Sequence, residues 1–177
     1  MAKNKEEKTN VMRTLDQKKI PYTAHSYDPD GPIDGVSVAQ TLGQPAEQVF
    51  KTLVTKAASG AYYVFDIPVA ENLDLKKAAK AVGEKSVAML SQKELLPLTG
   101  YVHGGCSPVG MKKQFPTVFH ATAADLPTIM VSAKLTTTTP TCVSRMGTPS
   151  RSNAATSLRR FRGLPAGVCF CVINYYL

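Results

Sequence analysis

Lys51 is the first residue of this sequence whose type and position point to chemistry. It lies in the segment FKTLV, residues 50–54, among apolar and β-branched residues. A buried ammonium group loses its hydration unless it finds a partner, so an inward-facing lysine here indicates a functional site. Strand alternation slightly favours the other interpretation, in which Lys51 points into water while Phe50 and Leu53 point elsewhere. Both interpretations stay open from this segment alone.

A glycine-rich segment, GGCSPVGMKK at residues 104–113, is the second candidate. Its backbone N–H groups are not covered by side chains, and two lysines end the segment, which suits anionic or polar ligand groups. A structural turn is an equally good explanation. The segment lacks the GKS or GKT ending of a phosphate-binding loop, and it does not match the dinucleotide fingerprint.

The remaining reactive side chains form no recognisable constellation. His25, His103 and His120 are well separated and lack metal-ligand spacing, so we expect no metal site. Cys106 stands beside Ser107 without a GxSxG elbow, and a cysteine among glycines more often packs than attacks. The four cysteines show no CxxC spacing, which favours reduced thiols over zinc or disulfides.

The net charge of +8 is unevenly distributed. Residues 1–134 carry +3, whereas residues 135–177 hold five arginines and no acidic residue. Within the first part, lysines cluster at 76, 77 and 80 and again at 112 and 113. A phosphate-binding footprint and a merely solvated face explain these clusters equally well.

The elements that must position these residues follow from periodicity and turn signals. A chain of 177 residues suits one domain, and no uncharged apolar run approaches the roughly 20 residues of a membrane span, so we expect a cytoplasmic protein. Strands and short helices interleave without a strict βαβ rhythm, which favours an α/β domain with a mixed sheet wrapped by helices. We expect helices at 11–20, 37–43 with Ser37 as cap, 72–82 and after Ser91, and strands at 22–27, 50–55, 62–68, 87–90, 115–120 and 128–132.

The composition changes after Lys134. Residues 135–177 contain no acidic residue or lysine and hold three of the four cysteines. We interpret residues 1–10 as a flexible N-terminus, 11–134 as the domain, and 135–177 as an atypical tail that is disordered or follows a reading-frame change. The apolar ending VCFCVINYYL could still form a strand.

The ordered segments IPYTAHSYD, VFKTLV, NLDLKKAAKAVG, TGYVHGGCSPVGMKK and IMVSA together resemble the YbaK/EbsC family of transfer-RNA editing proteins. The resemblance covers residues 11 to about 134 and stops after IMVSA, where the family continues with a turn, a strand and a helix. It implies a compact mixed α/β fold with a largely antiparallel, barrel-like core. Its pocket would receive the aminoacylated 3′ end of a transfer RNA and cut the ester.

The resemblance also assigns roles to residues. Lys51 becomes the catalytic residue, Tyr27 and Gly104 become substrate-binding residues together with Gly105 and Ser107, and no cofactor is implied. Phosphate contacts of the transfer RNA would come from Lys76, Lys77, Lys112 and Lys113.

The implied substrate is proline transfer RNA mischarged with cysteine, deacylated in trans by a substrate-assisted reaction, with prolyl-tRNA synthetase as a possible partner. Two alternatives stay open. One is a deacylase of another misacylated transfer RNA, such as Ala-tRNA(Pro), and the other is a non-catalytic module that binds transfer RNA or a synthetase.

Overall fold

A long β-hairpin forms the centre of the molecule. A computed structural model of the chain describes residues 8–27, 34–133, 141–146 and 171–172. Strand β2 (Val49–Ala57) pairs antiparallel with β3 (Tyr62–Pro68), in a register that runs from Phe50 opposite Pro68 to Lys56 opposite Tyr62. The turn between them contains Gly60 at φ +87°, a conformation that residues with a Cβ rarely adopt. Both predicted strands are thus present.

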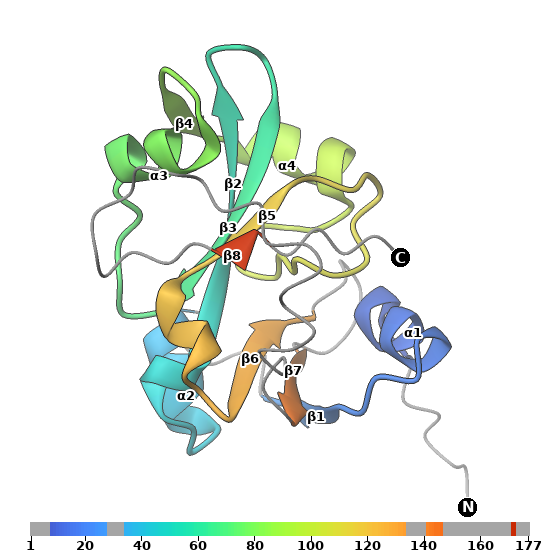
Figure 1. The fold of residues 1–177 in the computed structure, drawn as a ribbon. Helices are drawn as coiled ribbons and strands as arrows, with labels where there is room; N and C mark the ends of the chain where they lie inside the picture. Colours follow the sequence, from blue (N-terminus) through green and yellow to red (C-terminus); the bar gives the residue numbers. More distant parts are fainter. Residues whose placement is uncertain (1–7, 28–33, 134–140, 147–170, 173–177) are drawn as a thin grey trace, which may run out of the picture.

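Within the described residues, this hairpin forms the middle of an eight-stranded sheet (Figure 1), in the order β1-β7-β6-β2-β3-β5-β8, with β4 also paired to β2. Of the strand pairs in the described part of the chain, β2–β6 and β3–β5 are parallel and the other five are antiparallel, so the prediction of a mixed, largely antiparallel sheet is confirmed. The remaining strands are β1 (Thr23–Ser26), β4 (Val87–Met89), β5 (Thr117–Phe119), β6 (Thr128–Ser132), β7 (Thr141–Met146) and β8 (Cys171–Val172).

Short helices with local start and stop signals cover the sheet. They are α1 (Asn10–Gln17), α2 (Gly35–Thr41), α3 (Leu75–Val82) and α4 (Gln92–Thr99), with 3₁₀ turns η1 (Ala46–Gln48) and η2 (Ala121–Ala124). The helix α3 begins where Asp74 accepts two backbone N–H groups and ends at Gly83, φ +73°. The predicted cap of the second helix is wrong. Asp34 caps α2 by accepting the N–H of Ser37 at 3.0 Å, because an aspartate three residues earlier offers its carboxylate first.

Apolar clusters lie on both faces of β2 and β3. Phe50 and Val54 pack with α1, α4 and the glycine-rich loop, whereas Val49 packs with α2. Ala57 packs with α3 near the other end of β2. In Figure 1, α2 lies at the lower end of β2, and α3 lies beside the upper end of the hairpin. Buried residues of β2 therefore lie on both faces of the strand.

Two strands lie beyond residue 134, in the part of the sequence that composition sets apart. β7 pairs antiparallel with both β1 and β6, and β8, which lies within VCFCVINYYL, pairs with β5. Most of 135–177, and residues 1–7 of the N-terminal segment, lie outside the described residues, so the three-part division of the chain stays a prediction. None of the helices in the described ranges is long and apolar enough to span a membrane.

Candidate active site

The amine of Lys51 is turned into the protein. The residue is partly buried, and its Nζ donates a hydrogen bond of 3.1 Å to the carbonyl oxygen of Val69, which is 18 residues away. Val69 follows β3 directly and is itself tied back to β2, because its N–H donates to the carbonyl of Val49 at 2.9 Å. The sequence left two orientations of Lys51 open, and the structure shows the one that gives its ammonium group a protein partner.

Tyr27 lies close to the same region. It comes directly after β1 and packs against the apolar cluster that contains Val69. The other buried members of this cluster are Val38, Ala39, Val49 and Met130. Lys51 is thus hydrogen-bonded to a member of the apolar cluster against which Tyr27 packs.

The glycine-rich loop is shaped by Tyr101 and by two glycines in left-handed conformations. Tyr101 is buried, and its hydroxyl donates to the carbonyl of Val109 at 2.6 Å. Gly110 has φ +74° and lies so close that an added Cβ would be 3.1 Å from the Tyr101 hydroxyl oxygen. Gly104, at φ +78°, is exposed, and no atom of the described residues lies within 4 Å of the place where a Cβ would stand. The backbone at Gly104 is therefore open to a ligand.

The neighbouring loop residues are less accessible. Gly105 is buried, and its N–H donates to the carbonyl of Val102 at 3.1 Å. Ser107 has no exposed surface, and its hydroxyl oxygen accepts the N–H of Val109 at 3.3 Å. In this arrangement Ser107 braces the loop from inside, so contact of its side chain with a substrate stays a prediction.

Cys106 is not an activated nucleophile. The residue is 6% exposed, and its burial, with a smaller contribution from the nearby Asp66, raises the pKa of the thiol to about 12. The sulfur is therefore protonated at neutral pH, and a thiol attacks far more slowly than a thiolate. Among the described residues no group of three His, Cys, Asp or Glu side chains is arranged to hold a metal ion.

The buried part of the glycine-rich loop covers one face of β2, and the side chain of Lys51 projects from the opposite face. Cys106 packs with Phe50 and Val54, and these side chains alternate along the strand with that of Lys51. The structure therefore joins Lys51 with Val69 and the Tyr27 region. An approach of the Lys51 amine to Gly104 and Gly105 stays a prediction.

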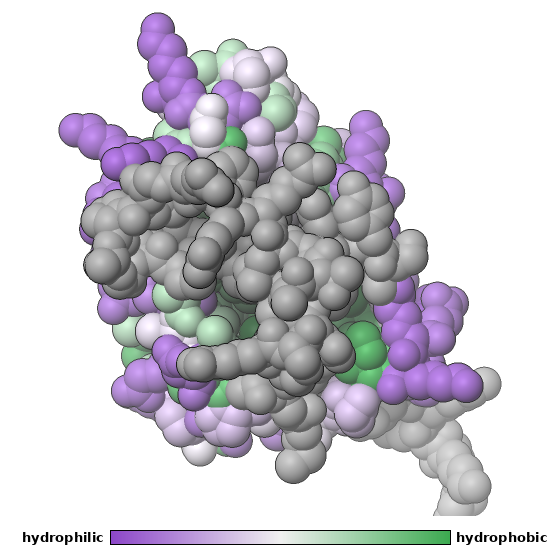
Figure 2. All heavy atoms as spheres, viewed as in Figure 1, coloured by the Kyte–Doolittle hydropathy of each residue, from purple (hydrophilic) through white to green (hydrophobic). Residues whose placement is uncertain are grey.

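The predicted phosphate-binding lysines are all exposed, in two separate elements. Lys76 and Lys77 occupy the first turn of α3, and their N–H groups donate to Asp74 at 2.9 and 3.0 Å. Lys112 lies along Gly100, and Lys113 follows it. Hydrophilic side chains project at the upper left of Figure 2, where α3 lies in Figure 1. The four lysines are accessible to a phosphate, and their contact with transfer RNA stays a prediction.

Asp66 is a buried acid that the sequence reasoning did not single out. It has no exposed surface, and one carboxylate oxygen accepts the hydroxyl of Thr52 at 2.6 Å. Its other oxygen, Oδ2, has no hydrogen-bond partner among the described residues. Burial raises its pKa to about 7, although the Thr52 hydrogen bond acts in the opposite direction. A charged residue within the apolar run VFDIP was the available signal, the same kind that identified Lys51.

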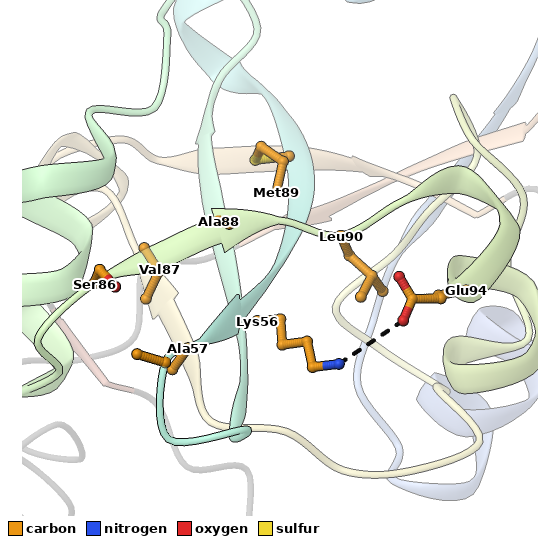
Figure 3. A pocket seen from close by; sticks show the side chains of 9 residues that line it. Lys56, Ala57, Ser86, Val87, Ala88, Met89, Leu90 and Glu94 are labelled. Atoms are coloured by element: carbon orange, nitrogen blue, oxygen red, sulfur yellow. Dashed lines mark ion pairs between the residues drawn. The ribbon is translucent and has the colours of Figure 1, made fainter.

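A surface pocket of about 280 Å³ lies at the other end of β2 (Figure 3). Lys56 and Glu94 face each other there with their charged atoms 3.9 Å apart, and both side chains are about half exposed. Lys56 is five residues from Lys51, or about 16 Å along a strand. This pocket is therefore separate from the Lys51 region.

Comparison with known proteins places the chain in a family. Residues 34–144 match the family model described as the aminoacyl-tRNA editing domain. A protein of Enterococcus faecalis, named "Putative Cys-tRNA(Pro)/Cys-tRNA(Cys) deacylase EbsC", is 47% identical over 135 residues, which cover 75% of this chain and 82% of the relative. The chain belongs to the aminoacyl-tRNA editing domain family. The resemblance to YbaK/EbsC proteins predicted from sequence is thereby confirmed.

Solved structures share the fold of this editing domain at lower identity. One is described as a putative trans-editing enzyme for prolyl tRNA synthetase, with a TM-score of 0.66, 23% identity, and coverage of 77% of this chain and 84% of that chain. Another, the hypothetical protein APE2540, has a TM-score of 0.68 at 17% identity and covers 77% of this chain and 88% of that chain. At these identities the likeness supports the editing-domain fold alone.

Proposed function

We propose that this editing domain is an aminoacyl-tRNA deacylase that acts in trans on proline transfer RNA mischarged with cysteine. The observation that carries the proposal is the 47% identity to a relative named as a Cys-tRNA(Pro)/Cys-tRNA(Cys) deacylase. The inward-turned amine of Lys51 adds a chemical group suited to the reaction, because an ammonium can bind the 3′ ribose or phosphate oxygens of the substrate.

The reaction we propose needs no nucleophile from the protein. The cysteinyl thiol attacks the carbonyl carbon of its own ester, the bond from that carbon to the ribose oxygen breaks, and the thiol proton passes to that oxygen. The products are a thiolactone and a free 3′ end. This agrees with a buried, protonated Cys106 and a buried Ser107. Holding the reacting groups together contributes about 7 to 11 kcal/mol in favourable intramolecular reactions.

The direct test is deacylation of Cys-tRNA(Pro) by the wild-type chain and by Lys51→Ala. We expect the variant to lose turnover by about 10-fold to 100-fold, the equivalent of one charged hydrogen bond, while it still binds the transfer RNA. Lys56→Ala is the matched control, since it removes an exposed lysine from the same strand and should leave turnover unchanged. Wild-type turnover in Lys51→Ala would contradict the proposed role of this lysine.

The same assay separates the alternatives. A chain without any turnover that still binds transfer RNA is the non-catalytic module. Faster release of alanine than of cysteine from the same transfer RNA would identify a deacylase of another substrate and exclude the thiol mechanism, because alanine has no thiol. Gel filtration with prolyl-tRNA synthetase tests the proposed partner, which should co-elute with the editing domain.

A further inference from the structure

Helix α2 begins in direct contact with Val69. A Cβ added to Gly35, the first residue of the helix, would lie 2.4 Å from Cγ1 and 2.8 Å from Cβ of Val69. Side-chain atoms do not approach each other so closely, so a larger residue at position 35 must push either the helix or Val69 away. The absent side chain, rather than an unusual backbone conformation, makes glycine necessary here.

Val69 is restrained on its other side as well. Its side chain is 8% exposed and packs in the cluster of Val38, Ala39, Val49 and Met130. Its N–H donates to Val49, two residues before Lys51, and its carbonyl accepts the Lys51 amine at 3.1 Å. A displacement of Val69 therefore moves the acceptor that holds the amine.

We propose that Gly35 is a positioning residue for Lys51, acting through Val69. The close contact of α2 with Val69 fixes the carbonyl to which the ammonium group is bound, and this sets where the amine stands when the substrate enters. Gly35 itself touches no reacting atom. The inference rests on the proposed function, because it assigns a purpose to the placement of Lys51.

Packing limits how the contact can relax. Val69 cannot move without disturbing its hydrogen bond to β2, and α2 is tied to the chain before it by the Asp34 cap. A misplacement of about 1 Å can reduce a rate by about 100-fold. We therefore expect Gly35→Ala to lower kcat for Cys-tRNA(Pro) by at least about 10-fold, with little change in KM.

The test compares Gly35→Ala, Val69→Ala and the double variant. Val69→Ala removes the Cγ1 atom at 2.4 Å and leaves the Cβ contact at 2.8 Å, so the double variant should recover part of the lost kcat. Gly60→Ala is the control for strain alone, because Gly60 has φ +87° with no atom within 4 Å of an added Cβ. It should lower the melting temperature and leave kcat unchanged below that temperature.

The outcomes separate this inference from the proposed function. Wild-type kcat in a folded Gly35→Ala variant, or a double variant with no recovery, overturns the positioning role. If neither Gly35→Ala nor the double variant folds, the contact serves the fold alone and the inference is also overturned. Wild-type kcat in Lys51→Ala instead contradicts the function proposed above, whatever happens at position 35.

Discussion

Lys51 and Asp66, two ionisable residues of the central hairpin, have different hydrogen-bond environments. Lys51 donates to a backbone acceptor, whereas the described residues offer Asp66 one hydroxyl donor, that of Thr52, for its two carboxylate oxygens. Thr52 stands opposite Asp66 in the register and next to Lys51 in the chain. A carboxylate that is fully buried with one unpartnered oxygen is costly, so the neutral acid is the form that the fold favours.

Asp66 should make stability fall as the pH rises. Its pKa is about 7 in the folded protein and about 3.9 in an unfolded chain. Below pH 4 the side chain is protonated in both the folded and the unfolded state, so Asp66 does not lower the free energy of unfolding. Between pH 4 and 7 only the folded state keeps the proton, so the free energy of unfolding decreases by up to about 1.4 kcal/mol per pH unit.

The measurement is urea unfolding of the wild type and Asp66→Asn from pH 4 to 8. We expect the variant to gain stability relative to the wild type as the pH rises, by about 4 kcal/mol at most, because its amide does not ionise. Asp125→Asn changes an exposed acid and serves as the control. A constant difference between Asp66→Asn and wild type across this range would show that Asp66 does not titrate as proposed.

At the scale of elements, α3 separates its buried and charged sides clearly. Ala78, Ala79 and Ala81 are buried, while Lys76 and Lys77 are exposed in the first turn. Lysines in the first turn are unfavourable because the helix dipole is positive at that end. Asp74 offsets part of this effect by capping the helix. We predict that these lysines contact an anion such as phosphate, which would offset their unfavourable position.

Neutralising the α3 lysines should weaken the salt dependence of transfer-RNA binding. If both bind phosphates, Lys76→Gln/Lys77→Gln reduces the slope of log K against log salt by about 1.4 to 1.8. Lys112→Gln/Lys113→Gln tests the second pair in the same way. Arg13→Gln/Lys93→Gln removes the same charge from α1 and α4, and its slope should match the wild type. An unchanged slope in the α3 variant would exclude phosphate contacts there.

Elements with local signals were predictable from sequence, and those set by distant contacts were not. The helix predicted over 72–82 does end at residue 82, because Gly83 directly after it is a local stop signal. The partner of Lys51 was not predictable, since Val69 reaches it only through the register of two strands. Gly35 belongs to a turn-rich segment, and its contact with Val69 is invisible without the fold.

At the scale of the whole molecule, β7 connects β1 to the rest of the sheet. β1 pairs with β7, and β7 pairs with β6, so β1 has no other strand partner among the described residues. Tyr27 directly follows β1. The placement of one predicted site residue therefore depends on residues 141–146, of which the family match includes 141–144.

A proline in β7 should release β1. Val143 lies between Ala24 of β1 and Val131 of β6, so Val143→Pro removes a hydrogen bond of one ladder or the other. We expect faster hydrogen exchange of the amides in β1, while those of β2 and β3 stay protected. Val143→Ala keeps the N–H and should resemble the wild type. Unchanged exchange in β1 of the proline variant would show that β7 does not hold it.

The strand order has a consequence for folding during synthesis on the ribosome. Thr23 meets Ser144, so about 120 residues must be translated between the two before they can pair. The β2–β3 hairpin can form as soon as it leaves the exit tunnel, whereas β1 must wait for β7 although it emerges earlier. The first strand synthesised is thus among the last to dock, and during that interval a nascent chain exposes an unpaired edge on which chaperones can act.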